Sequence, residues 1–111
     1  MHELGLAKDT LRKILEGAHK LGFQKVRLAD INIGETLITD KEEFLELFSQ
    51  VSKGTPAEGV ELKLTIMPLM AFCKSCKTEF KAKEMKKGCP TCEAEEFKIV
   101  SGKEIVIKEL K

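Results

Sequence analysis

Apolar residues recur at steps of three and four through the start of the chain, which is the period of an amphipathic α-helix. The apolar stripe consists of Leu4, Ala7, Leu11, Ile14, Leu15, Ala18 and Leu21. Gly22 follows at once, and glycine most easily adopts the left-handed conformation in which many helices end. The pattern therefore predicts a helix from Leu4 to Leu21.

A second amphipathic helix is predicted to begin after residue 40. Thr39 and Asp40 provide an N-cap ahead of an acidic first turn. The apolar face of this helix consists of Phe44, Leu45, Leu47, Phe48 and Val51. Because Gly54 interrupts the pattern after Lys53, we expect the helix to end there.

Four segments have the composition of β-strands. β-branched and aliphatic residues dominate 26–33, where two phases of apolar positions predict a bulge or two partly covered faces. Apolar and polar residues alternate over 60–66, as in a half-buried strand, and Pro68 ends the alternation. Residues 97–100 and 105–107 return to strand character on either side of a Ser-Gly turn.

Four cysteines form two Cys-x2-Cys pairs separated by twelve residues: Cys73, Cys76, Cys89 and Cys92. Two residues between thiols let one tight turn present both sulfurs to an ion, and two facing turns complete a tetrahedral thiolate set. Four thiolates leave no open coordination position, so we expect a structural zinc ion and not a hydrolytic centre. Iron accepts the same donors and stays an alternative, whereas a thioredoxin-like site needs only one such pair.

The order of these elements predicts the fold class. Residues 71–95 carry few large apolar side chains, so a bound metal would replace the missing burial there. We therefore expect an α+β fold in which two helices pack on a small mixed β-sheet, with an inserted four-cysteine zinc module. Residues 1–70 plus 96–111 form the α/β domain in this division, and residues 71–95 form the module.

Composition narrows the classes of protein. The 111 residues, of which 42% are hydrophobic and 33% charged, suit one globular domain or a domain with a small insert. No apolar run approaches the length of a membrane span, and the amino-terminal residues lack the pattern of a secretion signal. We therefore expect a cytoplasmic protein whose cysteines stay reduced and available for metal.

The charge is uneven although the net charge is only +1. Between the first and last cysteine, six lysines face two glutamates, which leaves +4 on that segment. We interpret these lysines as a solvated loop surface, because Phe80 is the single aromatic residue among them that could stack on a base. A zinc-ribbon module that binds nucleic acid, or a zinc-containing adaptor, stays open as the alternative.

The first three residues form a second candidate site. Met1, His2 and Glu3 bring together an amine, backbone nitrogens and an imidazole, a nitrogen-rich set that suits the tetragonal geometry of Ni(II) or Cu(II). The alternative is structural: His2 is a surface residue, and Glu3 is an anion that stabilises the start of a helix.

Taken together, these motifs resemble the HypA/HybF family of nickel metallochaperones, which mature NiFe hydrogenases and, in some bacteria, urease. The resemblance rests on Met1-His2-Glu3 with Leu6-Ala7, Ile31-x-Ile33-Gly34-Glu35, Gly54-Thr55-x-Ala57-Glu58-Gly59, the two cysteine pairs with Pro90, and Gly102-Lys103-Glu104-Ile105. It covers nearly the whole chain. One departure is Glu93, which follows Cys92 where such turns often have glycine.

The resemblance implies a mechanism and a set of partners. His2 would bind Ni(II) with nearby backbone nitrogens, Glu3 would complete or steady that site, and the four cysteines would hold zinc. The partners would be a HypB-type nickel-binding GTPase, the hydrogenase large-subunit precursor and urease accessory proteins, without nucleic acid or membrane. The chain itself would catalyse nothing. An iron-containing electron carrier on the same thiols is a further alternative, and a small hydrolase lacks a nucleophile with a base.

Overall fold

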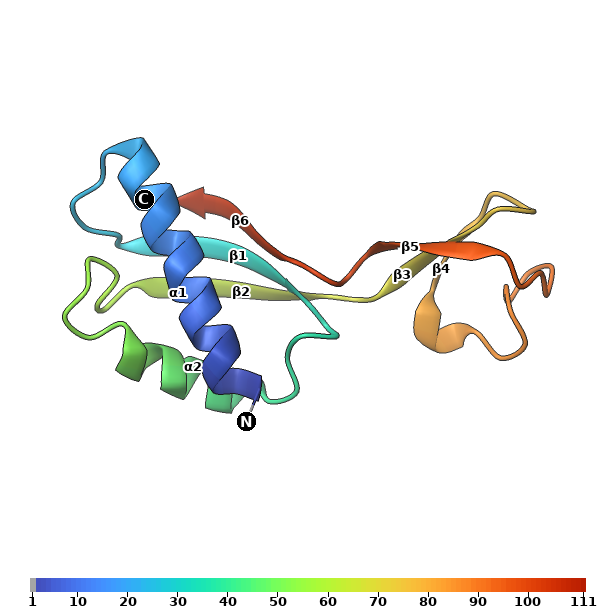
Figure 1. Ribbon diagram of the computed structural model, residues 1–111, viewed down its shortest axis with the longest axis horizontal. Helices are drawn as coiled ribbons and strands as arrows, with labels where there is room; N and C mark the ends of the chain where they lie inside the picture. Colours follow the sequence, from blue (N-terminus) through green and yellow to red (C-terminus); the bar gives the residue numbers. More distant parts are fainter. Residues whose placement is uncertain (1) are drawn as a thin grey trace.

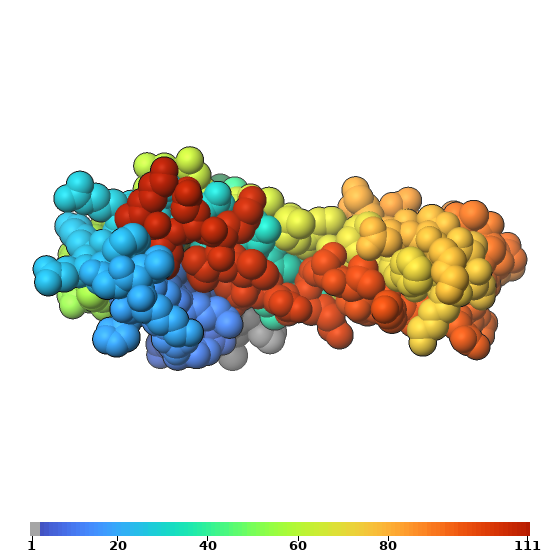
Figure 2. All heavy atoms as spheres, turned by 90° about the horizontal axis from the view of Figure 1, so that it is seen from above, coloured from blue at the N-terminus to red at the C-terminus, as the bar shows by residue number. Residues whose placement is uncertain are grey.

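Two lobes, each built around its own three-stranded sheet, follow one another along the molecule (Figure 1). This computed structural model describes residues 2–111, apart from the side chain of His2. The elements are α1 (His2–Leu21), β1 (Leu28–Gly34), α2 (Lys41–Val51), β2 (Glu61–Met67), β3 (Met70–Cys73), β4 (Glu79–Lys81), the 3-10 helix η1 (Ala82–Glu84), β5 (Phe97–Ser101) and β6 (Ile105–Leu110). The molecule measures 52 × 29 × 17 Å and narrows between the lobes (Figure 2).

The helical lobe consists of α1, α2 and a mixed sheet with the strand order β2-β1-β6. β1 is parallel to β2 and antiparallel to β6, and α2 supplies the crossover that a parallel pair needs. Ile31 of β1 lies opposite Leu64 and Ile107, so apolar residues of all three strands share one face. The register against β6 shifts between Asp30 and Ile31, which confirms the expected irregularity of this strand.

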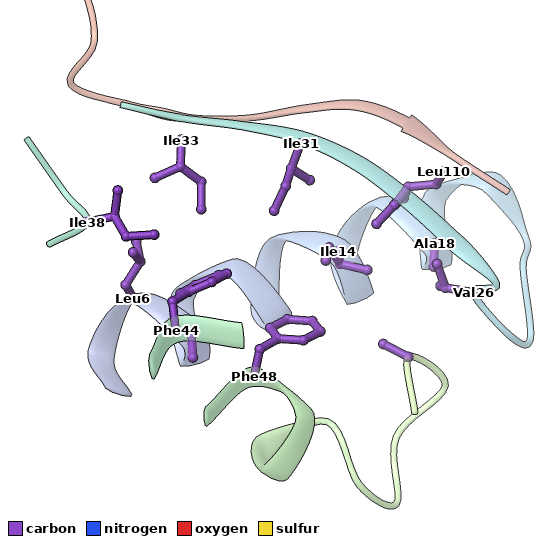
Figure 3. Close-up of a cluster of buried hydrophobic side chains, with 13 residues drawn as sticks. Leu6, Ile14, Ala18, Val26, Ile31, Ile33, Ile38, Phe44, Phe48 and Leu110 are labelled. Carbon is purple, nitrogen blue, oxygen red and sulfur yellow. The ribbon is translucent and has the colours of Figure 1, made fainter. Parts of the chain in front are cut away.

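Both helices lie on that apolar face (Figure 3). Ile31 and Ile33 point from β1 toward Phe44 and Phe48 of α2, with Ile14 of α1 between them. The two phenylalanine rings lie 6.1 Å apart between their centroids. The buried set is Leu6, Ala7, Ile14, Ala18, Val26, Ala29, Ile31, Ile33, Ile38, Phe44, Phe48, Ala57 and Leu110. This core fixes the start of α1 against the loop that precedes α2.

The predicted end of α1 and the predicted start of α2 are confirmed, whereas α1 begins at His2, two residues before Leu4, and α2 ends at Val51, two residues before Lys53. Gly22 has φ +76°, and the amide of Phe23 donates to the carbonyl of Ala18 at 2.9 Å, which closes the last turn of α1. Asp40 caps α2, because its carboxylate accepts a hydrogen bond from the amide of Glu43 at 3.1 Å. Neither α1 nor α2, the two α-helices within residues 2–111, has the length and apolar composition needed to cross a membrane.

The cysteine lobe is an antiparallel sheet with the strand order β4-β3-β5, together with η1 and the loops that carry the cysteines. Its core is small: Ala71 and Phe80 are buried with two of the cysteines, and Phe97 meets Phe80 edge to face at 6.3 Å. A lobe with so few apolar residues gains little from burial, so cross-links through the cysteines matter more for its stability.

Two chain segments cross between the lobes, and the residues after β1 hold them together. The amide of Leu69 donates to the Glu35 carboxylate at 2.6 Å, and the Thr36 hydroxyl donates to the carbonyl of Gly102 at 3.1 Å. A Cβ on Gly34 would collide with the backbone of Gly102, so glycine is required at this crossing. Gly102 itself has φ +97° and lies against Leu69. We call this contact region the waist.

The expected architecture is confirmed in its main parts: two helices on a mixed sheet, and four cysteines gathered in a separate module. The structure adds β3, β4 and η1, which the sequence did not predict. It also pairs β5 with β3, whereas the sequence grouped residues 96–111 with the helical unit. The short segment of β3 and the three residues of β4 give little periodicity to detect.

Candidate metal centre

The four predicted cysteines come together in the cysteine lobe. Their sulfur atoms all lie within 4.8 Å of one another. The Sγ atoms of Cys73 and Cys92 are 3.5 Å apart, and those of Cys76 and Cys89 are 3.6 Å apart. These separations are too long for disulfides, whose sulfurs lie about 2 Å apart. The four thiols therefore form one cluster of free donors.

Two tight turns of the same kind present these thiols. The amide of Cys76 donates to the sulfur of Cys73, and the amide of Thr91 donates to the sulfur of Cys89. Each turn closes on a residue in the left-handed region, Lys77 and Glu93, both with φ 62°. The sequence flagged the missing glycine at Glu93. The structure shows that Glu93 adopts the backbone conformation that glycine would adopt more easily.

The surroundings of the cluster favour thiolates at its buried sulfurs. The amide of Cys76, more than any other neighbour, lowers the pKa of the Cys73 thiol. Burial raises the pKa of Cys89, but hydrogen bonds from the backbone of its turn and from other sulfurs outweigh burial and lower it to about 6. At Cys92 the amide of Ala94 favours the thiolate, but the neighbouring sulfurs and desolvation outweigh it and raise the pKa to about 12. Crowded thiolates repel one another, and one of them keeps its proton.

The donor set fits a tetrahedral cation. A tetrahedron with metal–sulfur bonds of about 2.3 Å has edges of about 3.8 Å, close to the two measured sulfur separations. A divalent ion among four thiolates carries a net charge of −2, and the six lysines on the same segment oppose that charge. This balance of charge explains the excess of lysines on the segment without nucleic acid.

Glu3 is fixed in the helical lobe, where the first turn of α1 meets the loop that precedes α2. Its Oε1 accepts hydrogen bonds from the amide of Thr39 at 2.8 Å, the hydroxyl of Thr39 at 2.7 Å and the amide of Asp40 at 3.2 Å. The residue is 2% exposed. The carboxylate lies where α1 and α2 both begin, and the positive ends of helix dipoles favour an anion. Met1 and the side chain of His2 lie outside the described residues.

These hydrogen bonds shift the titration of Glu3. The amide and then the hydroxyl of Thr39 stabilise the carboxylate, burial acts in the opposite direction, and the net result lowers the pKa of Glu3 to about 2. Glu3 is therefore ionised throughout the physiological range. Sequence reasoning assigned Thr39 and Asp40 only to the cap of α2 and missed their contact with Glu3. No local pattern reveals a contact between residues 36 positions apart.

The two-layer α+β lobe and the separate cluster of four free thiols define a small metal-binding protein. The whole chain, residues 1–111, matches the family described as hydrogenase/urease nickel incorporation, metallochaperone, HypA. The chain belongs to this HypA family.

Individual relatives agree with this assignment. A hydrogenase maturation factor HypA from Albidiferax ferrireducens is 30% identical over 110 residues, which cover 99% of this chain and 97% of that protein. One from Acidithiobacillus ferrooxidans is 29% identical with the same coverage. The solution structure of the Ni metallochaperone HypA from Helicobacter pylori shares the fold, with a TM-score of 0.73 at 23% identity, covering 100% of this chain and 97% of that one.

Proposed function

We propose that this chain carries Ni(II) at its amino-terminal residues, delivers it during maturation of a NiFe hydrogenase, and holds one structural zinc ion with its four cysteines. The observation that supports the function most strongly is the match of the whole chain to the HypA family. We further propose that the protein acts in the cytoplasm and has no catalytic activity of its own.

For the zinc ion, we assign Cys73, Cys76, Cys89 and Cys92 as ligands. Zinc would cross-link the two turns, since each turn supplies two of the thiolates. Four thiolates leave no position for substrate or water, so the ion would be structural. The support comes from the sulfur separations and from the hydrogen bonds that favour thiolates at Cys73 and Cys89. The two turns bring the donors together, and the small core of the lobe gives the ion a structural purpose.

For nickel, we assign the His2 imidazole together with backbone nitrogens of Met1, His2 and Glu3. The first amides of an α-helix have no acceptor within the helix, and α1 begins at His2. Because three donors already engage Oε1 of Glu3, we assign this carboxylate to steadying the site through Thr39 and Asp40. The cargo would thus bind beside a rigid anchor and stay accessible for transfer.

The partners that suit this role are a nickel-binding GTPase of the HypB type and the precursor of a hydrogenase large subunit. Urease accessory proteins are further partners in this proposal, with urease as a second client. Nickel binding must be reversible for a carrier, since the metal has to pass to the next protein. A nitrogen-rich site without thiolate ligands is consistent with such moderate affinity.

The nickel assignment is tested by calorimetric titration of the zinc-loaded protein with Ni(II). We expect one nickel per chain in the parent protein, no binding in His2→Ala, and unchanged binding in His19→Ala, which removes the other histidine of the sequence. A free imidazole has a pKa of about 6.5 and must be neutral to bind metal, so affinity should fall below about pH 6.5. Equal binding by the parent and His2→Ala would refute the assignment.

The zinc assignment is tested by elemental analysis and by chelation. We expect one zinc per chain and a colourless protein, since iron on four thiolates would give colour and a redox couple. Removing the metal should make the cysteine lobe sensitive to protease while the helical lobe keeps its circular dichroism. Unchanged proteolysis of the cysteine lobe after verified metal removal would contradict a structural role.

A further inference from the structure

The four thiols of the centre differ sharply in their access to solvent. Cys73 is 0% exposed and Cys89 is 1% exposed, whereas Cys76 is half-buried and Cys92 is exposed. An incoming ligand or reagent therefore meets Cys92 first. Burial also slows the departure of a ligand, because a buried sulfur that leaves the metal needs a path to water or a new partner.

The two buried cysteines are held by the backbone of the lobe as well. Cys73 ends β3, lies opposite Phe97 in β5, and donates its amide to the carbonyl of Thr78 at 2.9 Å. The amide of Cys89 donates to the carbonyl of Ala94 at 2.9 Å. Both side chains belong to the small core of the lobe. Moving either sulfur would open that core.

Cys92 lies outside these strands, on the turn between Cys89 and Ala94. Its neighbours Thr91 and Glu93 are exposed, and Glu93 is held in the left-handed region with φ 62°. Lys77 has the same φ beside Cys76, so exposure, and not backbone strain, separates Cys92 from Cys76. Because Cys92 belongs to no strand and lies outside the small core, its exposed sulfur can leave the cluster without opening β3 or that core.

We propose that the metal of the four-cysteine centre enters and leaves through Cys92, with Cys73 and Cys89 as the ligands that release last. This inference rests on the proposed zinc site. In that exchange Cys92 would give up its bond to the metal and keep both bonding electrons, and the thiolate would take a proton from water and leave hydroxide. A thiolate or amine of the acceptor then occupies the vacated coordination position. Three thiolates retain the ion until the acceptor has bound.

The test is timed alkylation of the full-length, zinc-loaded protein with N-ethylmaleimide, followed by peptide mass spectrometry. A chromophoric chelator present in the solution reports zinc release at the same time. We expect Cys92 to react at least about tenfold faster than Cys73 and Cys89, and zinc release to follow the modification of Cys92. Faster modification of a buried cysteine, or simultaneous modification of all four in each molecule, would overturn the proposal.

Variants give a second measurement. Cys92→Ser should still bind one zinc per chain but transfer it to the chelator at least about tenfold faster, because the first bond to break is already gone. Cys89→Ser should lose the ion, because it removes a buried anchor. If Cys89→Ser kept its zinc and Cys92→Ser lost it, the inference about Cys92 would be wrong while the proposed zinc site would stand. If the parent protein, without any substitution, bound no zinc after reconstitution, both the proposed zinc site and this inference would be wrong.

Discussion

Replacing the left-handed residue of the second cysteine turn by glycine, Glu93→Gly, should tighten metal binding. The φ of 62° at Glu93 costs about 1–2 kcal/mol in a residue with a side chain. Glycine removes that cost but adds about 0.4–1 kcal/mol of backbone freedom to the unfolded chain. The difference is about 1 kcal/mol in favour of the folded lobe.

With the structural zinc ion proposed above, this gain should appear as metal affinity. Binding free energy and folding free energy are coupled in such modules, so about 1 kcal/mol corresponds to an affinity about fivefold higher. Competition against a chelator of known affinity, at fixed pH, measures the change. Lys77→Gly should give a similar gain, because Lys77 has the same φ in the first turn.

Matched variants separate backbone strain from charge. Glu93→Gly removes a negative charge and Lys77→Gly removes a positive one, so a gain shared by both variants cannot be electrostatic. Glu93→Ala removes the charge but keeps the strain, and Glu95→Gly places glycine at a neighbouring exposed residue; neither should raise the affinity. An unchanged or weaker affinity in both glycine variants would refute the reasoning from strain.

Three further outcomes are expected. The pKa of Glu3 is about 2 in the folded protein against an ordinary 4.5, so the stabilisation from its carboxylate is complete above about pH 4.5 and is lost as pH falls toward 2. In thermal melts across this range, the melting temperature of Glu3→Gln should therefore fall less with pH than that of the parent protein. Gly34→Ala should destabilise the protein by about 1–3 kcal/mol in urea unfolding through its collision at the waist, whereas Gly5→Ala, with nothing near its added methyl, should stabilise α1. Phe44→Ala should cost about 3–5 kcal/mol in the same assay, because Phe44 is 0% exposed at the centre of the core; a loss below about 1 kcal/mol would contradict the packing in Figure 3.

The sequence predicted those parts of the fold that local periodicity specifies. Both helices and the strand β2 were expected from the period of their apolar positions, and β1, β5 and β6 from their β-branched and aliphatic composition. The spacing of the cysteines likewise predicted a single cluster, because two tight turns with x2 spacing face one ion.

The remaining features depend on contacts between residues far apart in the chain. Glu3 pairs with Thr39, and Glu35 with Leu69, across 36 and 34 positions. Neither contact leaves a mark on the local pattern of hydrophobicity. The requirement for glycine at Gly34 is of the same kind, since it comes from the backbone of Gly102 and not from a turn.

The double crossing at the waist gives the cysteine lobe an entropic effect on the other lobe. β6 pairs with β1 only after the 37 residues from Pro68 to Glu104 have returned the chain to the helical lobe. Closing a flexible loop of that length costs about 3 kcal/mol, by the logarithmic dependence of closure entropy on loop length. A folded cysteine lobe brings its two ends together at Met70 and Ser101 and removes most of that cost in advance. A folded cysteine lobe therefore stabilises the pairing of β6 with β1 in the helical lobe, although no cysteine within residues 2–111 contacts that sheet through a strand pair.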